Sequence, residues 1–113
     1  MENKKILSLL FDLGVRPNYK GYEYLVEAIR LCVENEEYLT NAVGMYKEIS
    51  KNCNAKSWGA VERCMRTCLE CSKKCYNQKA FGEIIPNYML MKHIPNMLLV
   101  SSCVMKLKIK GVK

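Results

Sequence analysis

Residues 54–76 read NAKSWGAVERCMRTCLECSKKCY, a polar turn followed by the pattern of an amphipathic helix. The helix is expected from about Trp58 to Tyr76, with Ser57 as its N-cap. At about 100° per residue, its apolar and cysteine residues fall on one side. The opposite side collects Gly59, Glu62, Arg63, Arg66, Thr67, Glu70, Lys73 and Lys74. We therefore expect one side to pack inward and the other to meet a polar partner.

A second helix before this turn would complete a helix-turn-helix motif. Apolar residues at helical spacing predict a helix over residues 37–53. In the motif, the N-terminal residues of the second helix reach base edges in the major groove. Arg63 and Arg66 suit this role, because a guanidinium donates two hydrogen bonds to guanine O6 and N7. Glu62 could accept from cytosine N4, and Thr67 could touch a base methyl group or a phosphate.

The rest of the sequence also predicts helices, so the expected fold class is all-α, with about six helices in a single domain over residues 1–113. Valine and isoleucine are too scattered to form an alternating strand. Before the turn, we expect a helix capped by Asn3 and ended at Gly14, a turn over 15–20 and a helix over about 21–33 closed by Asn35. The helix over 37–53 has room for a break near Gly44. After Tyr76, we expect a short helix over 78–81 ended at Gly82, a loop over 84–94 and a last helix from Pro95 or Asn96.

The composition predicts an ordered protein without catalytic machinery. Half of the 113 residues are hydrophobic and 26% are charged, which excludes a disordered tail and a membrane protein. The apolar stretch over 94–107 is interrupted and shorter than the roughly 20 residues that span a bilayer. The N-terminus lacks a secretory pattern, so a cytoplasmic, nucleoid-associated location is expected. His93 is the single histidine and the carboxylates are scattered, so we expect no enzyme.

The formal charge of +7 is unevenly distributed along the chain. Residues 1–50 hold six basic and eight acidic groups, whereas residues 51–113 hold twelve basic groups and three acidic ones. Such a basic half is typical of proteins that meet a polyanion, most commonly nucleic acid. A lysine-rich solubilising surface would explain the same charge, and a solvated face would explain the charged side of the helix.

Three segments together resemble a known domain. They are LGVxPxxKGYxYLxEAI at residues 13–29, YxxIxK at 46–51 and VERxxR at 61–66. They resemble the C-terminal DNA-binding effector domain of the master response regulator of sporulation in endospore-forming bacteria. The resemblance is strong over about 6–76, and beyond it Asn96 and the apolar pattern that ends at Leu107 still fit. KGYxYL and VERxxR are specific in combination.

The resemblance implies a six-helix domain around a helix-turn-helix, which binds short promoter boxes as a transcription regulator. The family's base-contacting positions match Glu62, Arg63 and Arg66, whereas Thr67 stands where the family usually has histidine. The turn over 55–58 also looks one residue longer, so sequence preference and helix entry are expected to differ. Family domains line up on tandem boxes and touch the polymerase sigma subunit, which makes a homodimer and a sigma subunit the implied partners.

The family's full-length members begin with a phosphorylatable receiver domain, and the sequence leaves no room for one. We therefore expect an effector domain that lacks its receiver. Phosphates are expected to be held by Lys56, Ser57, Lys73 and Lys74. The lysines at 106, 108, 110 and 113 read as a solvated tail that could also contact phosphates.

The seven cysteines raise a metal hypothesis. Cys64, Cys68, Cys71 and Cys75 lie on one stripe, but Cys64 and Cys75 would be roughly 16 Å apart along the helix axis. One helix therefore cannot supply four zinc ligands, and the others would have to come from Cys32, Cys53, Cys103 or His93. We favour small core hydrophobes and expect no metal or cofactor, with metal binding and a redox role as alternatives.

Two other classes of function remain open from the sequence. One is a protein-interaction module that binds sigma factor or a full-length regulator without touching DNA. The other is a cysteine-rich metal-binding protein. An odd number of cysteines in a protein expected in the cytoplasm argues against a disulfide framework.

Overall fold

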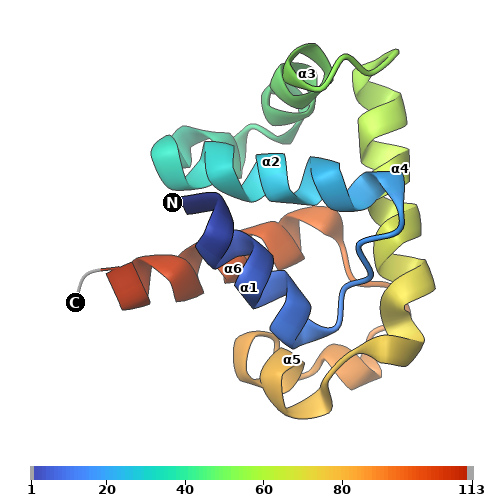
Figure 1. The fold of residues 1–113 in the computed structure, drawn as a ribbon, viewed down its shortest axis with the longest axis vertical. Coiled ribbons are helices and arrows are strands. Elements are labelled where there is room, and N and C mark those ends of the chain that lie inside the picture. Colours follow the sequence, from blue (N-terminus) through green and yellow to red (C-terminus); the bar gives the residue numbers. More distant parts are fainter. Residues whose placement is uncertain (1, 112–113) are drawn as a thin grey trace.

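The computed structural model describes residues 2–111, and within them the chain forms helices and no strand (Figure 1). The all-α prediction is confirmed. The α-helices are α1 (Glu2–Leu13), α2 (Lys20–Glu34), α3 (Ala42–Asn52), α4 (Trp58–Ser72), α5 (Gln78–Ile84) and α6 (Asn96–Gly111). Three short 3-10 helices join them: η1 (Glu36–Thr40), η2 (Lys73–Cys75) and η3 (Tyr88–Leu90).

Helix α2 is the centre of the packing, because it contacts α1, α3, α4 and α6. Leu25, Ala28 and Ile29 are fully buried on it. Its closest neighbour is α4, which runs along one edge of the molecule (Figure 1). The two helices approach so closely at Gly21 that a Cβ atom there would lie 2.0 Å from the carbonyl oxygen of Cys64. Glycine at this position is therefore required by the packing.

Several predicted helix ends are confirmed. Helix α1 ends before Gly14, which has a φ of +91° that favours glycine. Asn35 closes α2 and Asn96 begins α6. The loop expected over 84–94 is largely irregular, although it contains η3.

Other boundaries were predicted wrongly. Asn3 lies inside α1 and does not cap it. The stretch 37–53 breaks at Asn41, not at Gly44, because the Asn41 side chain accepts the N–H of Gly44 at 3.0 Å and starts a new helix. Helix α5 continues through Gly82, where nothing crowds the backbone.

The basic C-terminal segment is a helix, not the solvated tail that the sequence predicts. Lys106 pairs with Glu83 of α5 at 3.6 Å, and Lys108 pairs with Glu36 of η1. These ion pairs join α6 to elements far away in the sequence. The side chain of Lys110 and residue Lys113 lie outside the described part of the chain.

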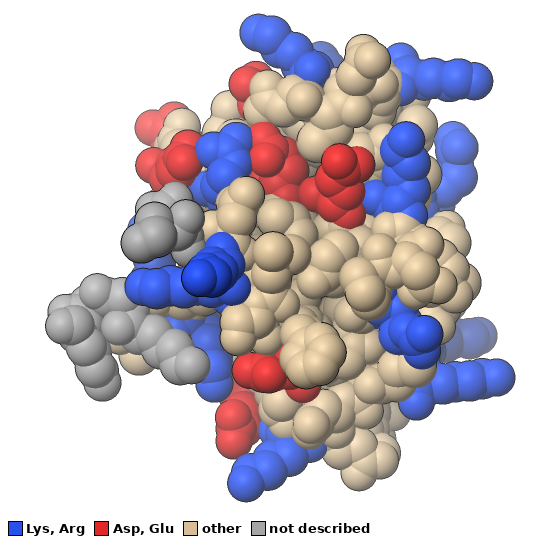
Figure 2. Space-filling view, in the orientation of Figure 1, with Lys and Arg blue, Asp and Glu red and all other residues tan. Residues whose placement is uncertain are grey.

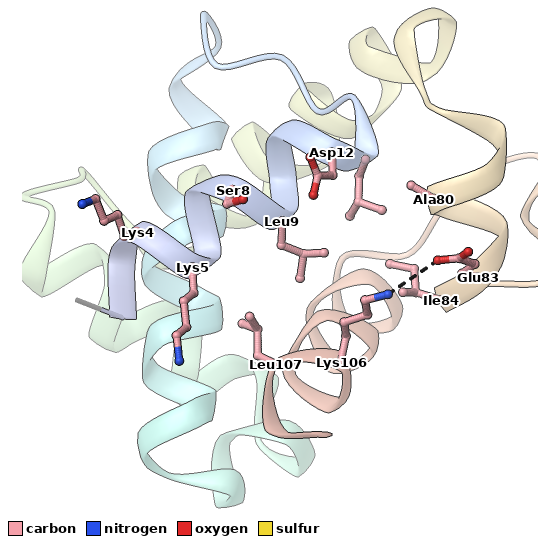
Figure 3. Close-up of a pocket in the computed structure, with 11 residues that line it drawn as sticks. Lys4, Lys5, Ser8, Leu9, Asp12, Ala80, Glu83, Ile84, Lys106 and Leu107 are labelled. Carbon is pink, nitrogen blue, oxygen red and sulfur yellow. Dashed lines mark ion pairs between the residues drawn. The ribbon is translucent and has the colours of Figure 1, made fainter. Parts of the chain in front are cut away.

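A cavity of about 600 Å³ opens between α1, α5 and α6 (Figure 3). Leu9 and Leu107 point into it from opposite helices, and the Lys106–Glu83 ion pair crosses one side. No lining residue comes from α4. Among the described helices, none is long and apolar enough to cross a membrane.

Candidate nucleic-acid interface

The connection between α3 and α4 is a tight turn over residues 53–57. Asn54 adopts a left-handed φ of +58°, a conformation that asparagine tolerates better than most residues. The turn is closed by the N–H of Ala55 donating to the Ser50 carbonyl at 2.9 Å, while the Ser50 hydroxyl donates to the Ala55 carbonyl at 3.2 Å. Ser57 then caps α4 by accepting the N–H of Ala60 at 3.2 Å, as predicted.

The inner side of α4 is only partly the predicted one. Its buried residues are Val61, Met65, Cys68, Leu69 and Ser72. Their mean direction lies roughly 80° from Cys64 around the helix axis, so Cys71 points about 100° away from the centre of the buried side. Cys71 and Cys75 are exposed and Cys64 is half-buried. The expectation that all four cysteines pack in the core is therefore wrong for Cys71 and Cys75.

The helix also ends earlier than predicted. Helix α4 stops at Ser72, and residues 73–75 tighten into η2. The segment before α2 packs against this end, since the N–H of Asn77 donates to the Leu13 carbonyl at 2.9 Å. A Cβ atom at Gly14 would lie 2.0 Å from the Cys75 carbonyl oxygen. The chain between α1 and α2 is therefore packed closely against the end of α4.

The N-terminal half of the outer side of α4 is open to solvent. Arg63, Arg66 and Thr67 are exposed, as predicted, and the Arg66 side chain is 55% accessible. Half-buried Glu62 lies 3.5 Å from the Arg66 guanidinium. At Gly59 an added Cβ atom would meet only the Ser57 hydroxyl, at 3.9 Å. The positions at Arg63, Arg66 and Thr67 are therefore accessible to a partner.

The C-terminal half of the same side is partly occupied by the loop before α6. The Glu70 carboxylate lies 2.5 Å from Nδ1 of His93, and Lys73 donates to the Lys92 carbonyl at 2.5 Å. His93, which lies in the loop expected over 84–94, therefore contacts α4. Lys73 and Lys74 are both exposed, but only Lys73 is engaged with the protein backbone. At the other end of α4, Lys56 and Ser57 are exposed.

A buried amide supports the open half of α4 from inside. Asn96, at the start of α6, is only 7% exposed. Its Nδ2 donates to the Glu62 carbonyl at 3.0 Å and to the Tyr46 hydroxyl at 3.3 Å. The Tyr46 ring stacks on Trp58 at 6.3 Å, and burial raises the pKa of Tyr46. Trp58 begins α4 as predicted, and 40% of it remains exposed.

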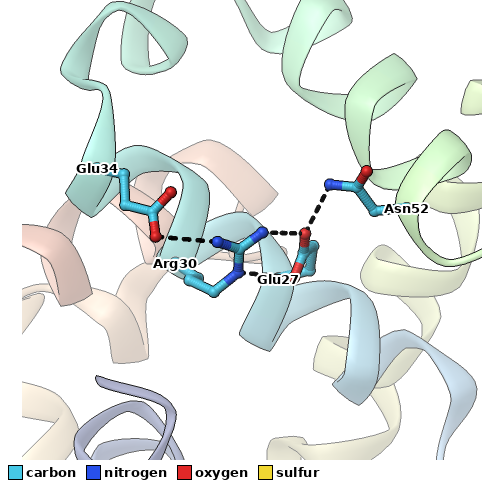
Figure 4. Close-up of polar contacts among 4 residues, drawn as sticks. All are labelled: Glu27, Arg30, Glu34 and Asn52. Atoms are coloured by element: carbon cyan, nitrogen blue, oxygen red, sulfur yellow. Dashed lines mark hydrogen bonds and ion pairs between the residues drawn. The ribbon is translucent and has the colours of Figure 1, made fainter. Parts of the chain in front are cut away.

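A charged network fixes the end of α3 on α2 (Figure 4). Arg30 donates to both Glu27 carboxylate oxygens, at 3.0 and 2.5 Å, and to Glu34 at 2.9 Å. The Asn52 amide reaches across from α3 and donates to Glu27 at 2.8 Å. The hydrogen bonds from Arg30 hold the pKa of Glu27 below its usual value. The last residue before the turn is thereby held against α2.

Acidic and basic side chains gather on different parts of the surface. Acidic side chains gather over the C-terminal end of α2 and η1, at the upper left of Figure 2. Lysine and arginine side chains project from the right edge, where α4 runs. Part of the basic half of the sequence therefore lies along the edge formed by α4, whereas Lys106 and Lys108 of α6 pair with acidic residues of other elements.

Sequence reasoning missed the residues that support this surface. The Glu27, Arg30 and Glu34 spacing is the signal of an ion pair along a helix, but nothing in the sequence joins it to Asn52. Asn96 reads as a helix start, and a single polar residue gives no sign that its amide is buried.

Within residues 2–111, no three histidine, cysteine or acidic side chains gather so that they could hold a metal ion.

One comparison with known proteins adds to this geometry. A model of the protein family described as the sporulation initiation factor Spo0A C terminal matches residues 6–106. The match includes α4 and the Asn96 contact that supports it.

Proposed function

Because the chain belongs to the family of Spo0A C-terminal domains, DNA-binding domains of a sporulation regulator, we propose that it reads duplex DNA with α3 and α4 as a helix-turn-helix. The observation that carries this proposal is the exposure of Arg63 and Arg66 on the open half of α4. Helix α4 would enter the major groove with its N-terminal half.

The proposed base contacts follow from the outer side of α4. Arg63 and Arg66 each donate to O6 and N7 of a guanine, worth about 1–3 kcal/mol of discrimination per base. Glu62 accepts from a cytosine amino group or orients Arg66, to which it is already close. Thr67 touches a thymine methyl group or a phosphate.

The proposed phosphate contacts lie at the two ends of the helix. Lys56 and Ser57 hold the backbone at the N-terminal end, and Lys73 and Lys74 at the C-terminal end. Lys74 is free to do so at once, whereas Lys73 would have to release the Lys92 carbonyl. Gly59 lets the DNA backbone come close to α4, because no side chain stands there.

The proposed partners beyond DNA follow from the family. We propose that two copies of the chain bind tandem promoter boxes and that the complex touches the sigma subunit of RNA polymerase. A protein-interaction module without DNA contact is the competing function, and a binding experiment separates the two.

The test is fluorescence anisotropy with a duplex selected from random DNA and a scrambled duplex of equal length. We expect salt-sensitive binding that prefers the selected duplex, and Arg63→Ala or Arg66→Ala should reduce that preference about 5- to 100-fold. Lys5→Ala, which removes a positive charge from α1, is the matched control and should keep the preference. Negligible affinity of the wild-type chain for every duplex would contradict the proposal.

A further inference from the structure

The structure sorts the seven cysteines by access to solvent. Cys32, Cys68 and Cys103 are buried, and burial raises their thiol pKa values to about 11, 11 and 12. Cys53 and Cys64 are half-buried. Only Cys71 and Cys75 are exposed, both where α4 ends and η2 begins. The accessible thiols of the chain are therefore gathered at one place.

Cys75 has a cationic neighbour. A guanidinium nitrogen of Arg16, Nη1, lies 3.1 Å from the Cys75 sulfur and donates to it. This contact is the main reason why the pKa of Arg16 is raised, so the guanidinium keeps its charge at every pH of interest. A positive charge beside an accessible sulfur attracts anionic reagents to that sulfur.

The position of Arg16 is fixed by its backbone. Its N–H donates to the Ser72 hydroxyl at 2.9 Å, and its carbonyl accepts from the Cys68 thiol at 3.7 Å. Both contacts are made by main-chain atoms, so a change of the Arg16 side chain leaves them in place. The guanidinium is therefore held at Cys75 by the same packing against the end of α4.

Cys71 provides a natural comparison on the same helix end. It is also exposed, but its interacting neighbour is the phenol of Tyr19, whose pKa is raised by the contact. A neutral phenol supplies a hydrogen bond without a positive charge. Arg16 also acts on this phenol, so the two exposed thiols differ in that the guanidinium donates directly to Cys75.

We propose that Cys75 is a modification site that exchanges with low-molecular-weight disulfides, preferably those that carry carboxylates. The Cys75 thiolate attacks one sulfur of the small disulfide, a new S–S bond forms to Cys75, and the old S–S bond breaks. The released half leaves as a thiolate and takes a proton from water. The small disulfide is the oxidant, and Arg16 attracts its carboxylates.

Modification has a consequence that rests on the proposed function. Cys75 follows directly on Lys73 and Lys74, which are proposed to hold DNA phosphates. An adduct that carries carboxylates would place negative charge there and weaken DNA binding. An uncharged adduct at the same sulfur would weaken it less.

The experiment exposes the full chain to oxidised glutathione and follows each cysteine by peptide mass spectrometry. We expect the adduct at Cys75 to form first and Cys75→Ser to remove the fast phase. Arg16→Gln should slow the reaction at Cys75 about fivefold and leave Cys71 unchanged. Arg16→Lys, which keeps a positive charge, should restore part of the rate, and thermal melting verifies that each variant is folded.

A neutral probe, 2-hydroxyethyl disulfide, separates the charge of the reagent from the reactivity of the sulfur. The preference of Cys75 for oxidised glutathione over this probe should shrink in Arg16→Gln. Equal or faster reaction at Cys71, or an unchanged rate in Arg16→Gln, would overturn the modification site. If the adduct forms at Cys75 but DNA affinity is unchanged, the site stands and its consequence for DNA binding is wrong.

Discussion

The outer side of α4 is open to solvent in its N-terminal half and partly covered by other segments of the chain in its C-terminal half. Around Arg63 and Arg66 the surface is open, and the support comes from inside, through Asn96 and Tyr46. From Glu70 onward, Lys92 and His93 lie against the outer side, and the segment before α2 holds the inner side at Ser72. One helix with a uniform amphipathic pattern is thereby divided into a half that can meet a partner and a half that is anchored.

The largest expected effect is a loss of stability from a substitution at Gly21, where α4 packs closely on α2. In Gly21→Ala the new Cβ atom would lie 2.0 Å from the Cys64 backbone, so the two helices must separate. We expect a loss of about 2–3 kcal/mol in the free energy of unfolding, measured by urea denaturation. A loss below about 0.5 kcal/mol would show that the packing of α4 on α2 does not require glycine at this position.

A smaller effect is expected from the inner support of the open half. Asn96→Ala removes the hydrogen bonds to Glu62 and Tyr46 and should cost about 1–3 kcal/mol in the free energy of unfolding. The matched control is Ser101→Ala, which removes a hydroxyl on α6 that bonds only within its own helix. Equal stability of the two variants would show that the Asn96 hydrogen bonds do not support the open half of α4.

The smallest effect on stability is expected at Gly59, on the outer side of α4, where the substitution should increase the free energy of unfolding. Gly59→Ala adds a methyl group that meets only the Ser57 hydroxyl, at 3.9 Å, and should stabilise the fold by up to about 1 kcal/mol, since alanine favours helix. If DNA approaches α4 here, the same variant should bind the selected duplex several-fold more weakly. Unchanged DNA affinity would indicate that the duplex keeps away from the first turn of α4.

The sequence predicts the open half of α4 better than the anchored half. Helical periodicity and the Ser57 cap depend on neighbouring residues, so the start of α4 and the outward direction of Arg63 could be foreseen. The exposure of Cys71 depends on which arc of the apolar side α2 covers, and periodicity does not contain that information. Asn96 acts across a separation of 34 residues, which is why its contact with Glu62 could not be predicted.

The most direct test uses the four arginines of the chain, which the fold divides into two pairs. Arg16 and Arg30 are engaged with Cys75 and Glu27, whereas Arg63 and Arg66 face solvent on α4. NMR of the arginine side-chain Nε–Hε groups, followed while the selected duplex is added, monitors all four at once. We predict large shifts for Arg63 and Arg66 and small ones for Arg16 and Arg30. Unshifted Arg63 and Arg66 signals in a saturated complex would contradict the account.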